Sequence, residues 1–163
     1  MRLRCAIAIV ALAATTPALA RDRLGVGNDW GAFRDAAVPR CYAIAMAADI
    51  PGKSRETTPY LTVANWPRRG IHGEIHVRLS RMAAPGRPVT LSLGGQKFAL
   101  ASGGIDAWAP DRRGDAAVIA LLRGNGEAVI TATARDGRPV RDVYHLAGAA
   151  SAIDAANLGC AAP

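Results

Sequence analysis

Three polar side chains spaced two residues apart, His72, Glu74 and His76, are the first candidates for chemistry in this sequence. Imidazole and carboxylate groups bind zinc and copper, so the trio raises a metal-handling protein as an alternative function. Side chains two apart on one strand face lie about 6.7 Å apart, whereas metal–nitrogen bonds are about 2 Å long. One strand therefore cannot bring all three onto one ion. We interpret the trio as a solvated polar face and predict no metal site.

Groups for nucleophilic catalysis are few. The sequence has no G-x-S-x-G motif of the kind that presents a catalytic serine. The pairs Gly94-Gly95 and Gly103-Gly104 are not followed by the Lys-Ser/Thr of a phosphate-binding loop. An envelope hydrolase remains an alternative, because a site that includes His145 could assemble from residues distant in the sequence. We predict no catalytic residues, no catalytic activity and no cofactor.

The first twenty residues have the pattern of a secretory signal peptide. Arg2 and Arg4 precede an apolar run from Cys5 to Ala14. Ala18-Leu19-Ala20 then supplies the small residues that a signal peptidase requires. The run is shorter than the roughly 20 residues that span a bilayer. We therefore expect cleavage after Ala20, one domain over residues 21–163 without a transmembrane segment, and a periplasmic or secreted location.

Of the three cysteines, Cys5 belongs to the predicted signal peptide, which leaves Cys41 and Cys160. Two cysteines in an exported chain favour one disulfide. This bond would close a loop of about 120 residues and stabilise the fold by something like 4–5 kcal/mol. A free catalytic thiol is the alternative, but Cys160 lies three residues from the end and Cys41 lies in a predicted strand, so neither has an activating setting. We predict the disulfide Cys41–Cys160.

Arginine dominates the charge of the chain. The formal net charge is +7 at pH 7, and only Lys53 and Lys97 among the 20 basic residues are lysines. A basic surface could bind a polyanion such as an anionic envelope glycan, or it could serve only as a solubilising surface. The candidate polyanion-binding residues are Arg68, Arg69, Arg78 and Arg81. An envelope protein is a second candidate partner, whereas we expect no nucleic acid, because few aromatic residues are available to stack on bases.

Two further patterns have simpler explanations than ligand binding. Arg113-Gly114-Asp115 spells a cell-adhesion tripeptide, but a turn glycine and a helix-capping aspartate explain the same residues. Trp30, Trp66 and Trp108 could line a ligand groove, but we interpret them as core anchors in a chain that is only 5% aromatic. Neither pattern therefore enters the predicted function.

Alternating apolar residues and turn signals predict a mostly β fold. The clearest strand is Ile71–Ser80, in which apolar and polar residues alternate. The other predicted strands are residues 30–33, 40–46, 60–64, 89–93, 96–100, 127–134 and 140–146, with a short piece over 105–108. Two short helices are predicted in the C-terminal half, residues 116–123 capped by Asp115 and residues 151–158 capped by Ser151 and ended by Gly159. These elements predict a β-sandwich or flattened barrel of seven to eight short antiparallel strands.

The C-terminal half resembles the invasion-associated locus B family. The resemblance is carried by a helix, a strand, a turn with Asp136-Gly137, a second strand, and then Leu146-Ala147-Gly148 followed by Ala149, Ala152 and Ile153. In the front half, Trp30 near the mature start and Cys41 in a strand agree more loosely. Family members carry a further cysteine pair where this chain has Trp108-Ala109-Pro110-Asp111, so the chain resembles a divergent member.

This resemblance implies a small exported bacterial protein without established catalytic residues. We therefore expect a non-enzymatic envelope protein that acts by surface binding, in envelope maintenance or host interaction. The oligomeric state is left open.

Overall fold

The computed structural model describes residues 21–48 and 55–161, so the predicted signal peptide lies outside the described residues. The described chain forms ten strands, two α-helices and one short 3-10 helix. No helix among these residues is long and apolar enough to cross a membrane. The predicted mostly β class, with two helices in the C-terminal half, is confirmed.

All ten strands belong to one open antiparallel sheet with the order β1-β2-β3-β4-β5-β8-β7-β6-β9-β10. The strands are β1 (Asp22–Gly27), β2 (Trp30–Asp35), β3 (Arg40–Met46), β4 (Tyr60–Trp66), β5 (Ile71–Arg78), β6 (Val89–Leu93), β7 (Gln96–Gly103), β8 (Asp106–Trp108), β9 (Glu127–Thr133) and β10 (Pro139–His145). The predicted count of seven to eight is too low. β1 offers only Leu24 and Val26 as apolar residues, and β8 has only three residues.

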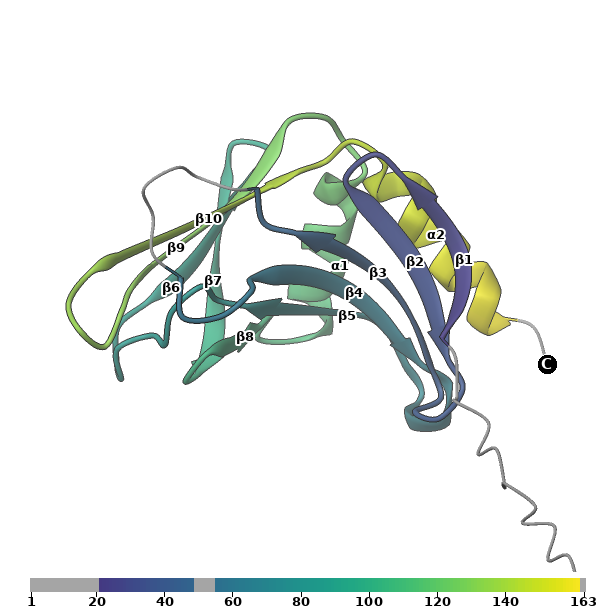
Figure 1. The fold of residues 1–163 in the computed structure, drawn as a ribbon, viewed down its shortest axis with the longest axis horizontal. Coiled ribbons are helices and arrows are strands. Elements are labelled where there is room, and N and C mark those ends of the chain that lie inside the picture. The colour runs from purple at the N-terminus through teal and green to yellow at the C-terminus, as the bar shows by residue number, and fades with distance from the viewer. Residues whose placement is uncertain (1–20, 49–54, 162–163) are drawn as a thin grey trace, which may run out of the picture.

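The sheet bends into two halves (Figure 1). Strands β1 to β5 form the first half, and β6, β7, β9 and β10 form the second. β8 links the halves, because it pairs with β5 on one side and with β7 on the other. The two halves also meet where the Ala48 amide, just after β3, donates a hydrogen bond to the Val143 carbonyl of β10, with N···O 2.8 Å. This partial closure is consistent with a sandwich or flattened barrel.

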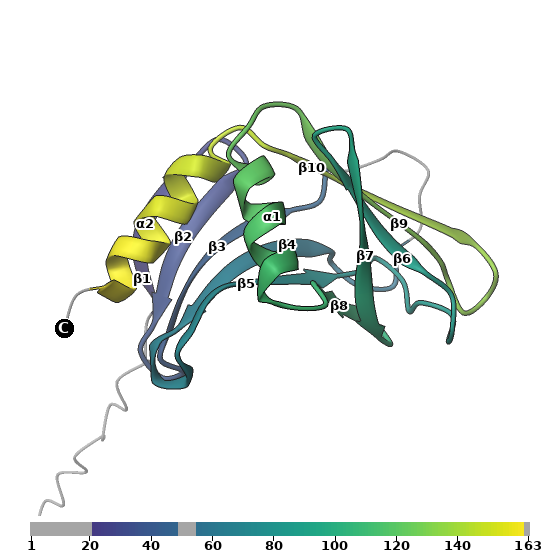
Figure 2. The ribbon, with the colours of Figure 1, turned by 180° about the vertical axis from the view of Figure 1, so that it is seen from behind.

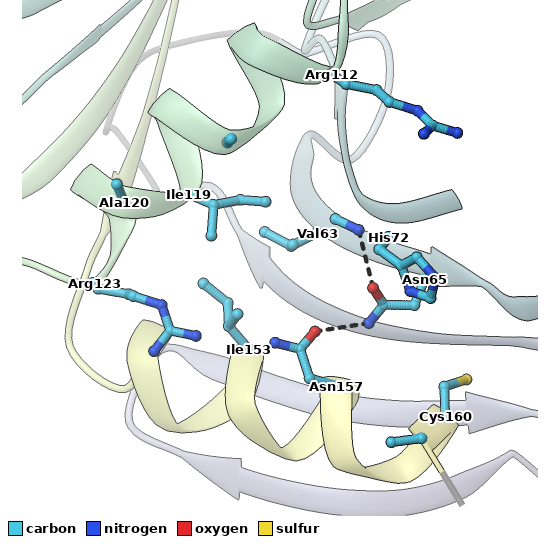
Figure 3. A pocket seen from close by; sticks show the side chains of 13 residues that line it. Val63, Asn65, His72, Arg112, Ile119, Ala120, Arg123, Ile153, Asn157 and Cys160 are labelled. Carbon is cyan, nitrogen blue, oxygen red and sulfur yellow. Dashed lines mark hydrogen bonds between the residues drawn. The ribbon is translucent and has the colours of Figure 1, made fainter. Parts of the chain in front are cut away.

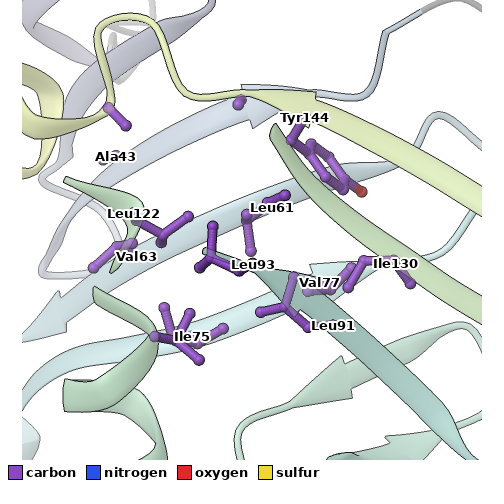
Figure 4. Packing of buried hydrophobic residues seen from close by; sticks show 14 of the residues in the cluster. Ala43, Leu61, Val63, Ile75, Val77, Leu91, Leu93, Leu122, Ile130 and Tyr144 are labelled. Carbon is purple, nitrogen blue, oxygen red and sulfur yellow. The ribbon is translucent and has the colours of Figure 1, made fainter. Parts of the chain in front are cut away.

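The hydrophobic core draws on both halves of the sheet. Leu61 and Val77 from the first half and Leu91 and Ile130 from the second are 0% exposed and belong to one buried cluster (Figure 4). Burial of each such side chain contributes about 1.5–3 kcal/mol. Trp30 is also in this core at 1% exposure. The bent sheet is therefore held together by apolar packing across the bend.

Both helices lie on the same face of the first half of the sheet (Figure 2). α1 (Arg112–Leu122) packs on β5 and β6, and α2 (Ala149–Ala161) packs on β1 to β4. The prediction that Asp115 caps α1 is wrong. The cap is Asp111, whose extended backbone lets its carboxylate accept the Gly114 N–H with N···O 2.7 Å. Asp115 lies in the first turn of the helix.

The predicted bounds of the second helix are also wrong. α2 begins at Ala149, directly after Gly148, so Ser151 lies inside the first turn rather than at the cap. The helix continues through Gly159 to Ala161. Gly159 lies against Leu24 of β1, where a Cβ would overlap the end of the leucine side chain. The glycine therefore permits close packing and does not end the helix.

Candidate functional site

The predicted disulfide is present. Cys41 and Cys160 are bonded, with a Cα–Cα distance of 5.7 Å and a sequence separation of 119 residues. Cys41 is fully buried in β3, and Cys160 lies near the end of α2. The bond therefore fixes the C-terminal helix to the N-terminal half of the sheet. Such bonds persist in oxidising compartments rather than in the cytosol.

The trio His72, Glu74 and His76 does not share one face. The register between β4 and β5 shifts between Ala64 and Trp66, which produces a bulge in β5 at His72 and Gly73. His72 lines a cavity under the helices, whereas Glu74 accepts the indole N–H of Trp66, N···O 3.0 Å, on the other side of the sheet. In the part of the chain that the structure describes, no group of three His, Cys, Asp or Glu side chains could hold a metal ion.

The face of the first half of the sheet that points away from both helices carries most of the aromatic residues. We call it the open face; it comprises Phe33, Tyr42, Tyr60, Trp66, His76 and Trp108. Strand register sets these side chains in rows, with Phe33 opposite Tyr42 and His76 opposite Trp108. The chain has three Trp, three Tyr and two Phe, and five of these lie on the open face. A pocket of about 380 Å³ opens on this face beside β2 and β3.

Three arginines lie over the rings of the open face. The guanidinium carbon of Arg40 is 4.6 Å from the ring centroid of Tyr42 and 5.3 Å from that of Trp66. Arg69 lies 4.9 Å from the Trp66 centroid, and Arg78 lies 5.5 Å from the Tyr60 centroid. Each such cation–π contact contributes about 0.5–1 kcal/mol at an exposed site. The open face is therefore aromatic and carries three guanidinium groups, of which Arg40 is paired with Asp35 and Arg78 with Asp106.

The Asp106 carboxylate forms hydrogen bonds with two side chains at the edge of the open face. Asp106 accepts two hydrogen bonds from Arg78, at 3.1 and 3.3 Å, and lies 2.9 Å from His76 Nε2. His76 stacks on Trp108 with ring centroids 5.2 Å apart. Burial raises the pKa of Asp106, but the hydrogen bonds from Arg78 and His76 outweigh this effect and hold the pKa below its ordinary value. The ionised carboxylate therefore orients both side chains.

The four arginines predicted to bind a polyanion do not form one patch. Arg68 and Arg69 are exposed in the 3-10 helix η1 (Pro67–Arg69), at the turn between β4 and β5. Arg78 lies at the opposite end of β5 and is paired with Asp106. Of these three, Arg69 and Arg78 contact open-face rings.

Arg81 has a structural role. It is only 7% exposed, and its guanidinium lies 2.9 Å from Glu56 and 3.1 Å from Asp136. Arg40 takes part in the open face instead, although its sequence context shows no basic cluster. A signal for Arg40 exists only in the strand pairing, since Cys41 lies opposite Asn65 and thereby sets Arg40 beside Trp66.

The Arg-Gly-Asp tripeptide and the three tryptophans lie in different parts of the fold. Within Arg113-Gly114-Asp115, the Asp115 carboxylate accepts the Ile75 N–H with N···O 2.8 Å, so the tripeptide belongs to the joint between α1 and β5. Trp30 is a core residue whose indole N–H donates to the His145 carbonyl at 2.8 Å. Trp66 and Trp108 lie on the open face instead of in the core, and Trp108 is 37% exposed.

A larger cavity, of about 670 Å³, lies between α1 and α2 on the helix side of the sheet (Figure 3). Val63, Ile119 and Ile153 give it an apolar interior. Asn65 donates to Asn157 with N···O 2.9 Å and accepts the Gly73 N–H at 2.9 Å, which ties β4 to α2 and to the bulge. Sequence reasoning missed this cavity, because its walls come from β4, β5, α1 and α2, and only the fold brings the two helices together over these strands.

Basic side chains lie at both ends of the cavity. Arg112 and His72 occupy one end, and Arg123 occupies the other (Figure 3). Arg123 is paired with Asp154, N···O 2.6 Å, and the hydrogen bond that Arg123 donates to this carboxylate is the main cause that raises the pKa of Arg123. Arg112 donates to the Gly70 carbonyl at 3.3 Å. The positive charge of Arg123 is therefore balanced by Asp154, whereas Arg112 bonds to a neutral carbonyl and keeps its charge for a ligand.

No family model, curated protein or solved structure matches this chain. The resemblance to the invasion-associated locus B family therefore stays a prediction from the residues. The hydrolase alternative also stays a prediction. His145 lies 3.3 Å from Glu127, and both side chains are 47% exposed at the strand ends of β10 and β9.

Proposed function

We propose that this protein is an exported, non-enzymatic protein of the bacterial envelope that binds an anionic glycan on its open face. The observation that carries this proposal is the stacking of Arg40, Arg69 and Arg78 on open-face rings. The disulfide supports an oxidising location, and the pattern of residues 1–20 supports export. The family resemblance, with a role in envelope maintenance or host interaction, is part of the same proposal.

The open face combines two kinds of group that recognise a charged sugar. Aromatic rings such as that of Trp108 offer a flat apolar surface with negative potential, on which sugar C–H groups can pack. Guanidinium groups form charge-assisted hydrogen bonds with carboxylate, phosphate or sulfate oxygens. Arg69 is the strongest candidate for this second contact, because it is exposed and forms no ion pair with the described residues.

The hydrogen bonds of the open face support binding rather than catalysis. His76 and Asp106 resemble two parts of a catalytic arrangement. Thr62 is the residue paired with His76 across the strands, but its hydroxyl donates to the His76 backbone carbonyl at 3.3 Å and not to the imidazole. If this imidazole activated Thr62 as a nucleophile, the Thr62 hydroxyl would have to donate its hydrogen bond to an imidazole nitrogen.

The test is the binding of heparin, a sulfated glycan, to residues 21–163 with the disulfide oxidised. We expect binding by titration calorimetry that weakens steeply as salt rises, and no binding of uncharged dextran. Arg69→Gln removes a charge-assisted hydrogen bond of about 1.5–3 kcal/mol, so affinity should fall by about tenfold or more. Arg141→Gln removes the same charge from an exposed position on β10 and is the matched control.

Two results would contradict the proposal. Equal losses for Arg69→Gln and Arg141→Gln would mean diffuse attraction to net charge instead of a site. Dextran binding as tight as heparin binding would mean that the arginines take no part in recognition. Trp108→Ala separates stacking from charge, because we expect it to lower the affinity without changing the salt dependence.

A further inference from the structure

We propose that the cavity between α1 and α2 binds a fatty acid, with its carboxylate at the Arg112 end and its hydrocarbon chain along the apolar interior. This site lies on the opposite side of the sheet from the open face and does not rest on the proposed glycan binding. The cavity volume of about 670 Å³ falls within the range of about 300–1,000 Å³ that is typical of small-molecule sites.

The middle of the cavity suits a hydrocarbon chain. Val63 from β4, Ile119 from α1 and Ile153 from α2 meet there (Figure 3). Ala116 and Ala120 also line it, and these small side chains on the exposed side of α1 leave the space between the helices open. Contact with apolar walls of this kind is favourable by about 25 cal/mol for each Å² of apolar surface removed from water.

The walls suit an aliphatic chain better than a peptide. The backbone groups in the middle of α1 are bonded within the helix. The Asn65 side chain donates a hydrogen bond to the Asn157 side chain, and its Oδ1 accepts the Gly73 N–H. A peptide would bury backbone N–H and C=O groups without partners against these walls, which is costly. A chain of CH₂ groups has no such groups to satisfy.

The charge at one end selects an anion. Arg112 is exposed, donates only to the Gly70 carbonyl, and forms no ion pair among residues 21–48 and 55–161. The two nearest carboxylates in the sequence bond to backbone N–H groups and not to Arg112. Asp111 accepts the Gly114 N–H, and Asp115 accepts the Ile75 N–H. His72 lies at the same end and adds a second polar contact for a carboxylate.

The opposite end already has its charge balanced. Arg123 is paired with Asp154 at 2.6 Å, so an anion gains less there than at Arg112. This asymmetry orients the ligand, with its carboxylate at Arg112 and its methyl end toward Ala120.

The experiment is the titration of decanoate into the exported chain with its disulfide intact, below the concentration at which decanoate forms micelles. We expect saturable binding at one site. Decanol has the same chain without the charge and should bind about tenfold more weakly, since it lacks the charge-assisted contact. Butyrate keeps the charge but lacks most of the chain, and should show no saturable binding at the same concentrations.

Two pairs of variants locate the site. Arg112→Gln should weaken decanoate about tenfold and leave decanol unchanged, whereas Arg113→Gln, at an exposed neighbour outside the cavity lining, should change neither. Ala120→Trp fills the cavity and should abolish binding of both ligands. Ala117→Trp adds the same side chain to an exposed part of α1 outside the cavity and should leave binding intact.

The proposal is overturned if decanoate shows no saturable binding to the wild-type chain. Binding that survives both Arg112→Gln and Ala120→Trp would also overturn it, because the ligand would then lie elsewhere. Equal affinity for decanoate and for the cation decyltrimethylammonium would overturn the assignment of an anion. Far-UV circular dichroism of each variant verifies that the fold is retained.

Discussion

Among single residues, Asp115 joins α1 to the sheet. Its carboxylate accepts the Ile75 N–H with N···O 2.8 Å. Burial raises the pKa of Asp115 above its ordinary value, the hydrogen bond from Ile75 opposes this only in part, and the charges of Glu74 and Asp111 raise the pKa further. The folded state therefore needs the oxygen acceptor of Asp115 but is destabilised by its negative charge.

Two substitutions at this residue should have opposite effects at neutral pH. Asp115→Asn keeps an oxygen acceptor and removes the charge, so stability should stay equal or rise. Asp115→Ala leaves the Ile75 N–H without a partner and should cost about 1–3 kcal/mol. Urea unfolding of the oxidised protein measures both variants. Equal destabilisation by the two would show that the carboxylate charge itself is needed.

The same residue predicts a dependence on pH. The pKa of Asp115 in the folded state lies above the ordinary value of 3.8, so its contribution to stability is fully present below that pH and is lost as pH rises through the folded-state pKa. The advantage of Asp115→Asn over wild type should therefore grow from acidic to neutral pH. An advantage that shrinks over this interval would mean that the folded-state pKa is lowered.

Among the elements, α2 depends on close approach to the sheet. Ala149, Ala152 and Ala156 are buried against it, so the helix packs through small side chains. Gly148 directly before the helix has φ +90°, and a Cβ at this position would overlap the carbonyl oxygen of Gly27 in β1. Gly148 therefore permits both the turn that follows β10 and the contact between β1 and the start of α2.

Gly148→Ala and Gly137→Ala form a matched pair that isolates this contact. Both glycines have positive φ, +90° and +82°, but nothing lies within 4 Å of a Cβ placed on Gly137. Both variants should lose about 1 kcal/mol for the backbone conformation, and Gly148→Ala should lose a further 1–3 kcal/mol or so from the overlap. Urea unfolding measures the difference, and equal losses would show that α2 shifts without cost.

For the whole molecule, local patterns predict elements well and surfaces poorly. β3 and β6 match their predicted ranges, because flanking turns and apolar residues define them locally. The disulfide follows from simple elimination, since only two cysteines remain after the predicted cleavage. The sequence does not locate the start of α1, because Asp111 and Asp115 are both residue types that cap a helix and only the backbone conformation decides between them.

Both candidate sites depend on strand register and helix placement, which the sequence does not display. Because of the bulge at His72 and Gly73, the His72 side chain lines the cavity on the helix side of the sheet, whereas Glu74 and His76 lie on the side of the open face. Trp66 and Arg40 meet only through the pairing of β3 with β4. Alternation along one strand predicts a shared face for the histidines, and one extra residue in the ladder is enough to change it.

Export and the Cys41–Cys160 disulfide underlie the proposed function of this molecule in the envelope. The most direct test is the intact mass of the protein recovered from its native host, measured after thiol alkylation under denaturing, non-reducing conditions. We predict a chain that begins at Arg21 and carries no alkylated cysteine. A chain that retains Met1–Ala20, or a mature chain with two alkylated thiols, would contradict an exported protein stabilised by this disulfide.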